Sequence, residues 1–405
     1  MPRVSRLLTI AICLAVLPTT GWASSPDLFG FGARAIGSAG AVVSHPKGFE
    51  AVYHNPAGLS FETHPGVTLG YTFGRSILHH DDSDLDSTDA TSTLIGFALP
   101  LPFGGGLKKR IALGGGFTIP TNTVLNADLP RPGDPNFAVL ANRAQTVTLQ
   151  AALSVRLSDA FAFGAGFMAL SSLEGRIEVG PNAEGRIGSS ARDQLVASYA
   201  PVIGFLAHLS TNVSLGAVYR GASAATFELP LSANLGEGFS IPIPELAIRG
   251  VAQYDPAQIE AEVSWRLGDA RVALGVNWNR WSQFPQPIVY AAAPADHPAL
   301  PSPNFSDAME YGIGYEQAVN SALTVRAGYR YLQTPVPTAQ SVHAHLGSDR
   351  HLLAIGAQLS WSRVHLGVAA QAHLLESAQL KRTDHAPTEH GGKLWVLAVE
   401  IGVTL

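Results

Sequence analysis

The sequence predicts an all-β protein, a 14-stranded antiparallel transmembrane β-barrel with an N-terminal hatch inside the lumen. Three observations indicate this fold. Charged residues make up 14% of the 405 residues, well below the roughly 25% of soluble proteins. Beyond the N-terminus, no stretch has the roughly 18 consecutive apolar residues of a membrane-spanning helix. The chain instead alternates between apolar and polar residues over long stretches. These stretches are longer than the about 5 or 6 residues of a strand in a soluble protein. Their length suits a membrane-spanning strand, which needs about 9 to 11 residues. The strand lengths therefore argue against the alternative, a large soluble β-protein.

Residues 1–23 have the three parts of a secretory signal peptide. Arg3 and Arg6 form a basic start, an apolar stretch runs from Leu7 to Leu17, and Gly21-Trp22-Ala23 offers a small-x-small cleavage site. The apolar stretch is too short to span a bilayer. The single cysteine, Cys13, lies inside this segment, so we expect the mature chain to be exported and to have no thiol.

Residues 24–65 precede the first predicted strand and are interpreted as the hatch. They contain a run of small residues, "GARAIGSAGAVVS", a short helix expected from Lys47 to His54, and the turn-rich stretch "EAVYHNPAGLSF". Eight strands roughly fill a barrel with their own side chains, and 16 to 18 leave an aqueous channel. A barrel of fourteen strands therefore needs an occupant unless it is an open pore, and this segment is the candidate.

Residues 66–405 supply the predicted transmembrane β-barrel. Short connections such as "SDA" and "GDA" alternate with long polar or Pro-rich ones, as in outer-membrane barrels with short periplasmic turns. An even strand number returns the C-terminus to the periplasm, so we predict the bacterial outer membrane as the location. A bulge or kink is expected at "AQYDPAQ" (Ala252 to Gln258), because Pro256 cannot donate to a strand ladder. The predicted strands are 66–79, 89–103, 110–122, 143–157, 160–176, 193–208, 211–230, 244–267, 271–290, 306–317, 322–334, 349–361, 363–378 and 392–405.

Period-2 alternation places several charged side chains toward the lumen. A charge on the lipid face costs about 2–4 kcal/mol at mid-depth for Arg or Lys, which favours this phase. Arg326 and Arg330 are the candidates for binding a ligand carboxylate, because guanidinium pairs with carboxylate through two hydrogen bonds. The alternative for both is a salt bridge with lumen acids or with the hatch. The predicted lumen charges are Arg220, Glu260, Glu262, Arg266, Glu310, Glu316, Arg326, Arg330 and Glu400.

The tetrapeptide Asn55, Pro56, Ala57 and Gly58 is the candidate gate of the hatch. Pro56 fixes its own φ and pushes Asn55 toward extended geometry, while Gly58 permits a tight backbone. The prediction is a rigid turn whose amide can bond to neighbouring strands. An ordinary structural turn is the alternative reading.

Other chemistry finds little support. The stretch "HHDDSDLDSTDA" resembles a calcium loop at Asp82, Asp84 and Asp86, but it lacks the turn Gly and closing Glu of an EF-hand, which favours a solvated loop. A lipase would need a serine activated by a histidine, and no G-x-S-x-G elbow occurs. The formal net charge of −5 argues against nucleic acid. We predict no enzymatic activity, no cofactor and no metal site.

Two stretches near the N-terminus resemble a known family. "FGARAIGSAGAV" followed by "AVYHNPAGLS" is similar to the hatch of the FadL/TodX-type outer-membrane long-chain fatty acid transporters, with its Asn-Pro-Ala turn after an aromatic residue. Further similar stretches are "VNWNRWSQF", "MEYGIGYE", "LTVRAGYRYLQTPVP" and "DRHLLAIGAQLSW", so that the resemblance covers essentially the mature chain.

This resemblance implies passive uptake of hydrophobic small molecules, long-chain fatty acids first. Ligand would reach a lumen pocket above the hatch, a shift at Asn55, Pro56 and Ala57 would open the path, and release would be lateral. There are two alternatives: the chain takes up aromatic hydrocarbons, or it is a structural barrel that scaffolds surface or secreted partners. We expect a monomer surrounded by outer-membrane lipid and lipopolysaccharide. Two departures concern the substrate and the strand end: the loops 123–142 and 177–192 are short and polar, and the chain ends in Leu405 rather than an aromatic residue.

Overall fold

The computed structural model describes residues 25–85, 89–121, 133–140, 147–181, 187–233, 246–286, 288–290, 300–383 and 385–405. The predicted signal peptide, with Cys13, lies outside the described residues, as do parts of the long loops. None of the described helices is long and apolar enough to cross a membrane.

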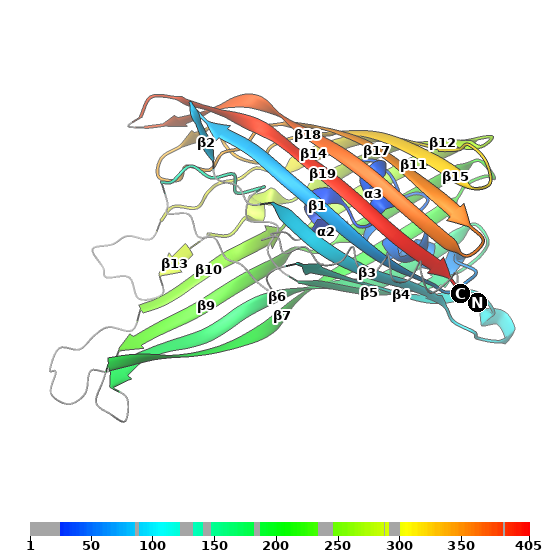
Figure 1. Cartoon of the computed structure of the whole chain (residues 1–405), viewed down its shortest axis with the longest axis horizontal. Helices are drawn as coiled ribbons and strands as arrows, with labels where there is room; N and C mark the ends of the chain where they lie inside the picture. Colours follow the sequence, from blue (N-terminus) through cyan, green and yellow to red (C-terminus); the bar gives the residue numbers. More distant parts are fainter. Residues whose placement is uncertain are drawn as a thin grey trace, which may run out of the picture.

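The wall is a closed antiparallel barrel of fourteen strands, as predicted (Figure 1). The first and last strands close it, with a register that runs from Gly66 opposite Thr404 to His80 opposite His390. In order around the barrel the strands are β1 (Gly66–His80), β3 (Ala90–Pro100), β4 (Ile111–Pro120), β5 (Thr148–Arg156), β6 (Phe161–Pro181), β7 (Ile187–His208), β8 (Val213–Arg220), β11 (Gln258–Leu267), β12 (Ala270–Asn279), β14 (Ala308–Ala318), β15 (Leu323–Leu332), β17 (Arg350–Trp361), β18 (Val364–Arg382) and β19 (Thr388–Thr404).

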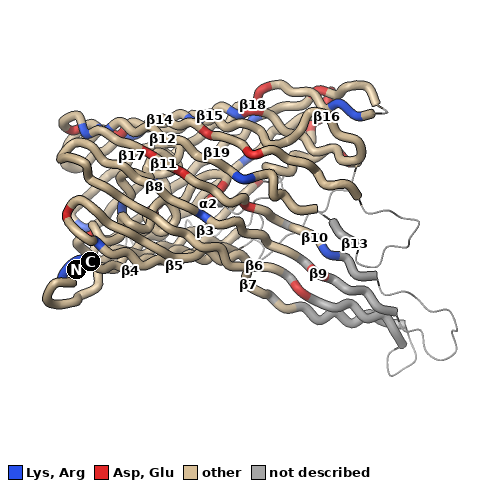
Figure 2. The backbone as a smooth tube through the Cα atoms, turned by 180° about the vertical axis from the view of Figure 1, so that it is seen from behind, with Lys and Arg blue, Asp and Glu red and all other residues tan. Residues whose placement is uncertain are grey.

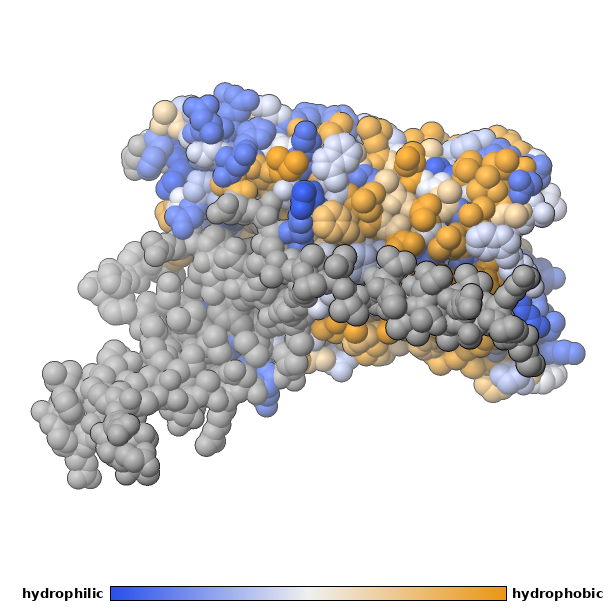
Figure 3. All heavy atoms as spheres, viewed as in Figure 1, coloured by the Kyte–Doolittle hydropathy of each residue, from blue (hydrophilic) through white to orange (hydrophobic). Residues whose placement is uncertain are grey.

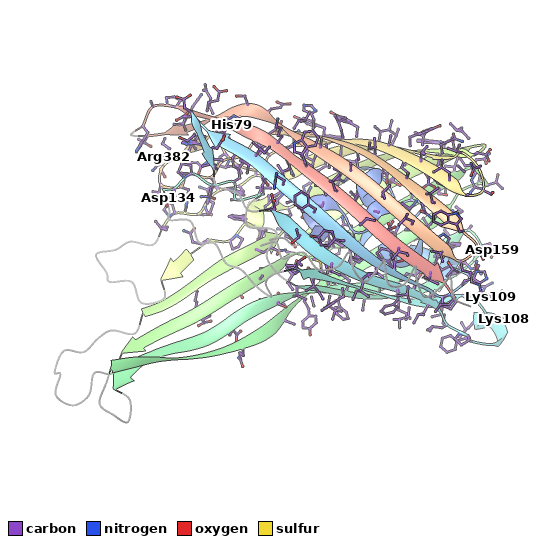
Figure 4. All side chains as sticks on the ribbon, in the orientation of Figure 1. His79, Lys108, Lys109, Asp134, Asp159 and Arg382 are labelled. Atoms are coloured by element: carbon purple, nitrogen blue, oxygen red, sulfur yellow. The ribbon has the colours of Figure 1, made fainter. Side chains whose placement is uncertain are left out.

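The two ends of the barrel differ in their connections. The end that carries the C-terminus has the tight turns, and Figure 4 shows Lys108, Lys109 and Asp159 there. His79 and Asp134 lie at the opposite end, among the long loops. Because outer-membrane barrels keep their short turns in the periplasm, we call the first end periplasmic and the second external.

The outer face of the wall is apolar. Along β1 and β19 the side chains in one phase are exposed hydrophobics, whereas the opposite phase is buried. Apolar side chains gather on the visible outer face between more polar ends (Figure 3), and most of the wall carries no charge (Figure 2). This surface is what a strand bathed in lipid requires. Its exposed residues on β1 and β19 include Val67, Leu69, Tyr71, Leu397, Val399 and Ile401.

Three predicted strands are shorter than expected. The 211–230 strand is divided into β8 and β9 (Ser223–Ala233). Beside the break, the backbone N–H of Gly221 donates to Pro201, and β9 then pairs with β10 (Leu246–Asp255) and, in parallel, with β6. The 244–267 strand is likewise divided into β10 and β11 around Pro256, where the kink was predicted.

The third exception is the predicted 271–290 strand, which ends at Asn279. The 3-10 turn η4 (Trp281–Gln283) and the short β13 (Ile288–Tyr290) follow it. Trp281 packs among Tyr254, Phe284 and Phe305 instead of extending the ladder. Smaller elements at the ends of the barrel are β2 (Ser83–Leu85), β16 (Ala339–Gln340) and the periplasmic turn η3 (Gly105–Leu107).

Residues 25–65 lie inside the barrel, and we refer to them as the hatch. The helical pieces α2 and α3 are visible within the wall in Figure 1. The helix predicted between Lys47 and His54 is present as a 3-10 turn followed by a single α-helical turn. The elements are α2 (Ser25–Phe29), α3 (Ala33–Gly37), η1 (Gly48–Glu50), α4 (Ala51–His54) and η2 (Pro56–Phe61).

Candidate functional site

The side chain of Asn55 forms hydrogen bonds both within the hatch and to the barrel wall. Its backbone is extended, with φ −166° and ψ 99°, as expected for a residue before proline. The side-chain Nδ2 donates to the carbonyl oxygens of Val43 and Phe205, each at 2.9 Å. The Oδ1 accepts the N–H of Ala57 at 3.2 Å and so caps η2. The fully buried amide therefore bonds to the hatch, to β7 and to its own turn.

Two glycines of the wall let this turn approach. Gly164 on β6 and Gly204 on β7 are cross-strand partners, and both face the turn. A Cβ on Gly204 would lie 2.2 Å from the Asn55 Oδ1, and one on Gly164 would lie 2.4 Å from the carbonyl carbon of Pro56. Only glycine leaves room for such a backbone approach.

The same kind of contact recurs around the barrel. On eight further occasions a lumen-facing glycine lies where any side chain would collide with the hatch. These ten positions, which we call the glycine belt, are Gly74, Gly96, Gly114, Gly116, Gly164, Gly204, Gly216, Gly314, Gly328 and Gly356. The belt shapes the inner wall to the hatch over most strands.

A buried ionic network holds the hatch on its periplasmic side. Glu316 on β14 accepts Arg34 Nε at 3.2 Å and Arg326 Nε at 2.8 Å, and it lies 3.4 Å from the Lys47 ammonium. Arg34 also donates to the His45 carbonyl at 3.0 Å. A cavity of about 330 Å³ adjoins this network and is lined by the chain ends of β1 and β19.

Glu50 and Glu400 meet at the start of α3 in this network. Glu400 accepts the N–H of Ala33 at 2.9 Å, and Glu50 accepts the next N–H, that of Arg34, at 3.1 Å. Burial, together with the neighbouring Glu400, raises the pKa of the Glu50 carboxyl to about 8. Burial lowers the pKa of His54, elsewhere in the hatch, to about 3, which keeps its imidazole neutral.

A second ionic network lies on the external side of the hatch. Glu260 accepts Arg220 Nη2 at 3.0 Å and Arg330 Nη2 at 2.8 Å. Arg330 further donates from Nη1 to Glu310 at 2.9 Å and from Nε to the hatch carbonyl of Ala39 at 2.9 Å. A cavity of about 70 Å³ lies between this network and the hatch.

The two arginines predicted as carboxylate ligands are thus separated by the hatch. Arg326 belongs to the periplasmic network, where it binds Glu316 and Gln358. Arg330 belongs to the external network and lines its cavity. Both make salt bridges with lumen acids, which was the alternative reading. A role for either in ligand binding remains a prediction.

The other predicted lumen charges are mostly inside. Arg220, Glu260 and Glu262 are buried, and Glu310, Glu316 and Glu400 are half-buried. Arg266 is exposed beside the β11–β12 turn and so departs from the expectation, because the strand there reaches the periplasmic end. Glu262 accepts both the N–H and the hydroxyl of Ser44, which ties it to the hatch.

An apolar column connects the external loops with the hatch. Phe137, Leu140 and Leu346 of the loops pack in one buried cluster with Leu28, Phe29 and Ile36 of the hatch. Leu78, Leu380, Leu394 and Val396 supply the wall side of this column. A lumen face this apolar differs from the polar interior of water-filled barrels. The column therefore offers apolar packing surface between the loops and the hatch.

The described part of the acidic loop makes ordinary loop contacts. Asp81 accepts the backbone N–H of Glu389 at 2.7 Å, and His80 lies 2.9 Å from the hydroxyl of Thr388. Asp86 lies outside the described residues. Among the described residues, no group of three His, Cys, Asp or Glu is arranged to hold a metal ion.

Sequence reasoning missed the glycine belt and the burial of Glu50. The available signal was the phase of the wall glycines, since Gly164, Gly204 and Gly328 all fall on the lumen side of their strands. Glu50 lies in a short helical segment where periodicity cannot separate buried from exposed positions.

Comparison with known proteins places this architecture. Residues 15–399 match the family described as outer membrane protein transport protein (OMPP1/FadL/TodX). The chain matches none of the curated proteins with which it was compared.

Several solved structures share the fold. A Pseudomonas aeruginosa FadL homologue is 16% identical, with a TM-score of 0.65 over 96% of this chain and 99% of that one. The P. putida toluene transporter TodX is 16% identical, with a TM-score of 0.63 over 94% and 99%. The CymD monoaromatic hydrocarbon channel is 14% identical, with a TM-score of 0.57 over 94% and 98%.

Proposed function

The chain belongs to the FadL/TodX family of outer-membrane transport proteins, and from this premise we propose that it takes up uncharged hydrophobic small molecules by passive diffusion, with the hatch as its gate. The family transports hydrophobic compounds across the outer membrane. The proposal adds the charge of the ligand and the role of the hatch.

The apolar column is the observation that carries this proposal. It runs from Phe137 and Leu346 at the external loops to Phe29 in the hatch, with buried apolar side chains throughout. Burial of apolar surface contributes about 25 cal/mol per Å², so an apolar ligand gains by leaving water for such a column. The hatch residues at its end must then move aside, which assigns gating to the segment that Asn55 fixes. We expect release to be lateral, into the bilayer.

Uptake by a host that lacks its own transporter tests this function. Cells that produce the chain should accumulate labelled toluene and labelled oleate-sized neutral lipids faster than cells with an empty vector. A polar residue in the column, Leu140→Asn, should slow this uptake severalfold. The neighbouring Val139→Asn is the matched control, because Val139 packs in the separate aromatic cluster of Trp281 and Phe305.

Equal accumulation by producing cells and empty-vector cells would contradict the proposal and would favour the scaffold alternative. If Leu140→Asn and Val139→Asn slow uptake equally, the apolar column is not part of the uptake path, although uptake itself still holds.

Aromatic hydrocarbons fit the proposed uncharged class, and long-chain fatty acids, which carry a carboxylate at neutral pH, are the second candidate. The similarity to a toluene transporter and to a monoaromatic hydrocarbon channel supports the first. The similarity to a FadL homologue supports fatty acids. The external network favours the uncharged class, because Glu260 and Glu310 already compensate the positive charge of Arg330.

A further inference from the structure

The cavity on the external side of the hatch joins a charged wall to apolar surroundings. Its volume is about 70 Å³, enough for the polar end of a ligand rather than for a whole molecule. Leu28 and Phe29 line it and also belong to the apolar column. A ligand in the column can therefore place one end in this cavity.

The charges at this cavity already compensate one another. Arg220 and Arg330 share Glu260, and Arg330 also binds Glu310. Two guanidinium groups thus face two carboxylates. Asp27 of the hatch supplies a third carboxylate, whose Oδ1 accepts hydrogen bonds from Tyr53 and Gln258. Arg350, the third arginine there, also has interaction partners, with its Nη1 3.5 Å from the Nδ1 of His373. His54 contributes no positive charge, because its Nε2 accepts the N–H of Phe31 at 3.3 Å.

Glu310 is the more accessible acid of the pair. Its side chain is 18% exposed, against 4% for Glu260. Its Oε1 accepts the Asn279 amide at 3.0 Å, and its Oε2 accepts Arg330 at 2.9 Å and Asn277 at 3.4 Å. A carboxylate oxygen has about two acceptor sites, so Oε1 can accept one more hydrogen bond.

We propose that Glu310 sets the class of ligand that this cavity accepts: a neutral amphiphile whose polar end carries a hydroxyl or another hydrogen-bond donor. The hydrogen-bond donor of the ligand fills the remaining acceptor site of Glu310, and the hydrocarbon part of the ligand enters the apolar column. A ligand carboxylate would add an unpaired negative charge beside Glu310 in a site of low dielectric. This inference rests on the proposed function and names its substrate class.

Binding of three ligands that differ only in their polar end tests the inference. The probes are 4-butylphenol, 4-butylanisole and 4-butylbenzoate, with the full chain in lipid nanodiscs at pH 7.5, by calorimetry against empty nanodiscs. The phenol should bind about tenfold more tightly than the anisole, which lacks the donor, and than the benzoate, which carries the charge. In Glu310→Gln the benzoate should gain about tenfold.

Glu316→Gln is the matched control. It removes the same carboxylate from the same strand, but Glu316 lies in the periplasmic network with Arg34 and Arg326. The order of the three ligands should be that of the wild type. A shift on SDS gels between heated and unheated samples confirms that each variant is folded. If Glu310→Gln does not fold, Glu310→Asp retains the charge and should retain the phenol preference.

The outcomes separate this inference from the proposed function. Binding of all three probes with equal affinity, or a benzoate preference in the wild type, would overturn the role of Glu310 and leave hydrophobic uptake standing. An equal gain of benzoate in Glu310→Gln and Glu316→Gln would do the same. Binding of none of the probes, together with no cellular uptake, would end both.

Discussion

The side chain of Asn55 is placed so that its loss affects hatch and wall together. In Asn55→Ala the carbonyl groups of Val43 and Phe205 lose their amide donor inside the barrel. Each unsatisfied group costs about 1–3 kcal/mol. The hatch should therefore be held less firmly, and single channels in planar bilayers should show more frequent or larger openings than the wild type.

The control for this prediction is Asn212→Ala, at an exposed periplasmic turn. It should leave conductance unchanged. An Asn55→Ala protein with wild-type conductance would return the Asn-Pro turn to its alternative reading, an ordinary structural turn.

Glu50 gives hatch docking a dependence on pH. Burial raises its pKa from the ordinary 4.5 to about 8 in the docked hatch, so the docked state holds the proton more tightly. The contribution of this carboxyl to docking is complete below about pH 4.5 and decreases as the pH rises through about 8. Hydrogen exchange of the hatch amides, corrected for the intrinsic rate, should become faster across this window.

Glu50→Gln keeps the shape of the side chain without the ionisation. Its hatch protection should vary less with pH than that of the wild type. Parallel pH profiles for the two proteins would assign the dependence to another group.

At the scale of elements, a side chain added at a glycine-belt position tests whether the wall strand or the hatch turn gives way. Alanine has no disadvantage against glycine in a strand, but a Cβ at Gly204 would lie 2.2 Å from the Asn55 amide. In Gly204→Ala we expect a folded barrel with a displaced turn, seen as increased conductance. Gly70→Ala is the control, because the nearest atom to its Cβ is an ordinary 3.5 Å away. Equal conductance of both variants would show that the turn adapts to the belt.

The strands illustrate how far sequence reasoning reaches. Alternation and turn composition located the wall strands and their direction, because the two faces of each strand meet lipid and lumen. The break between β8 and β9 was missed, since "YRGASAAT" keeps its apolar content. The hydrogen-bond partners nevertheless change there, from β7 and β11 for β8 to β6 and β10 for β9. Pairing of that kind is set by the position of other strands and leaves no local signal.

The same limit applies to the charged residues. Phase alone placed Arg326 and Arg330 in the lumen. It could not separate them, because the division depends on where the hatch crosses β15, with Ser38 packed against Gly328 between them. Depth in a barrel follows from packing between distant segments, which a single sequence does not display.

For the whole molecule, the proposed gating role of the hatch predicts that its removal opens the lumen. A chain that lacks residues 25–62 should still form the wall, because β1 pairs with β19 through backbone bonds that do not involve the hatch. Its lumen should then fill with water, and its ion conductance should rise toward that of a porin. Planar-bilayer recording checks this, and an unchanged conductance would contradict the assignment of the hatch as the gate.

The glycine belt also bears on how the protein is assembled. The hatch directly precedes β1 and touches strands as far along the chain as β19, where Glu400 accepts the N–H of Ala33. Its contacts cannot be complete until the last strand has been inserted and has met the first. Closure of the cylinder and burial of the hatch are therefore coupled late events in folding. An assembly intermediate with an open seam would therefore leave the hatch without part of its burying surface.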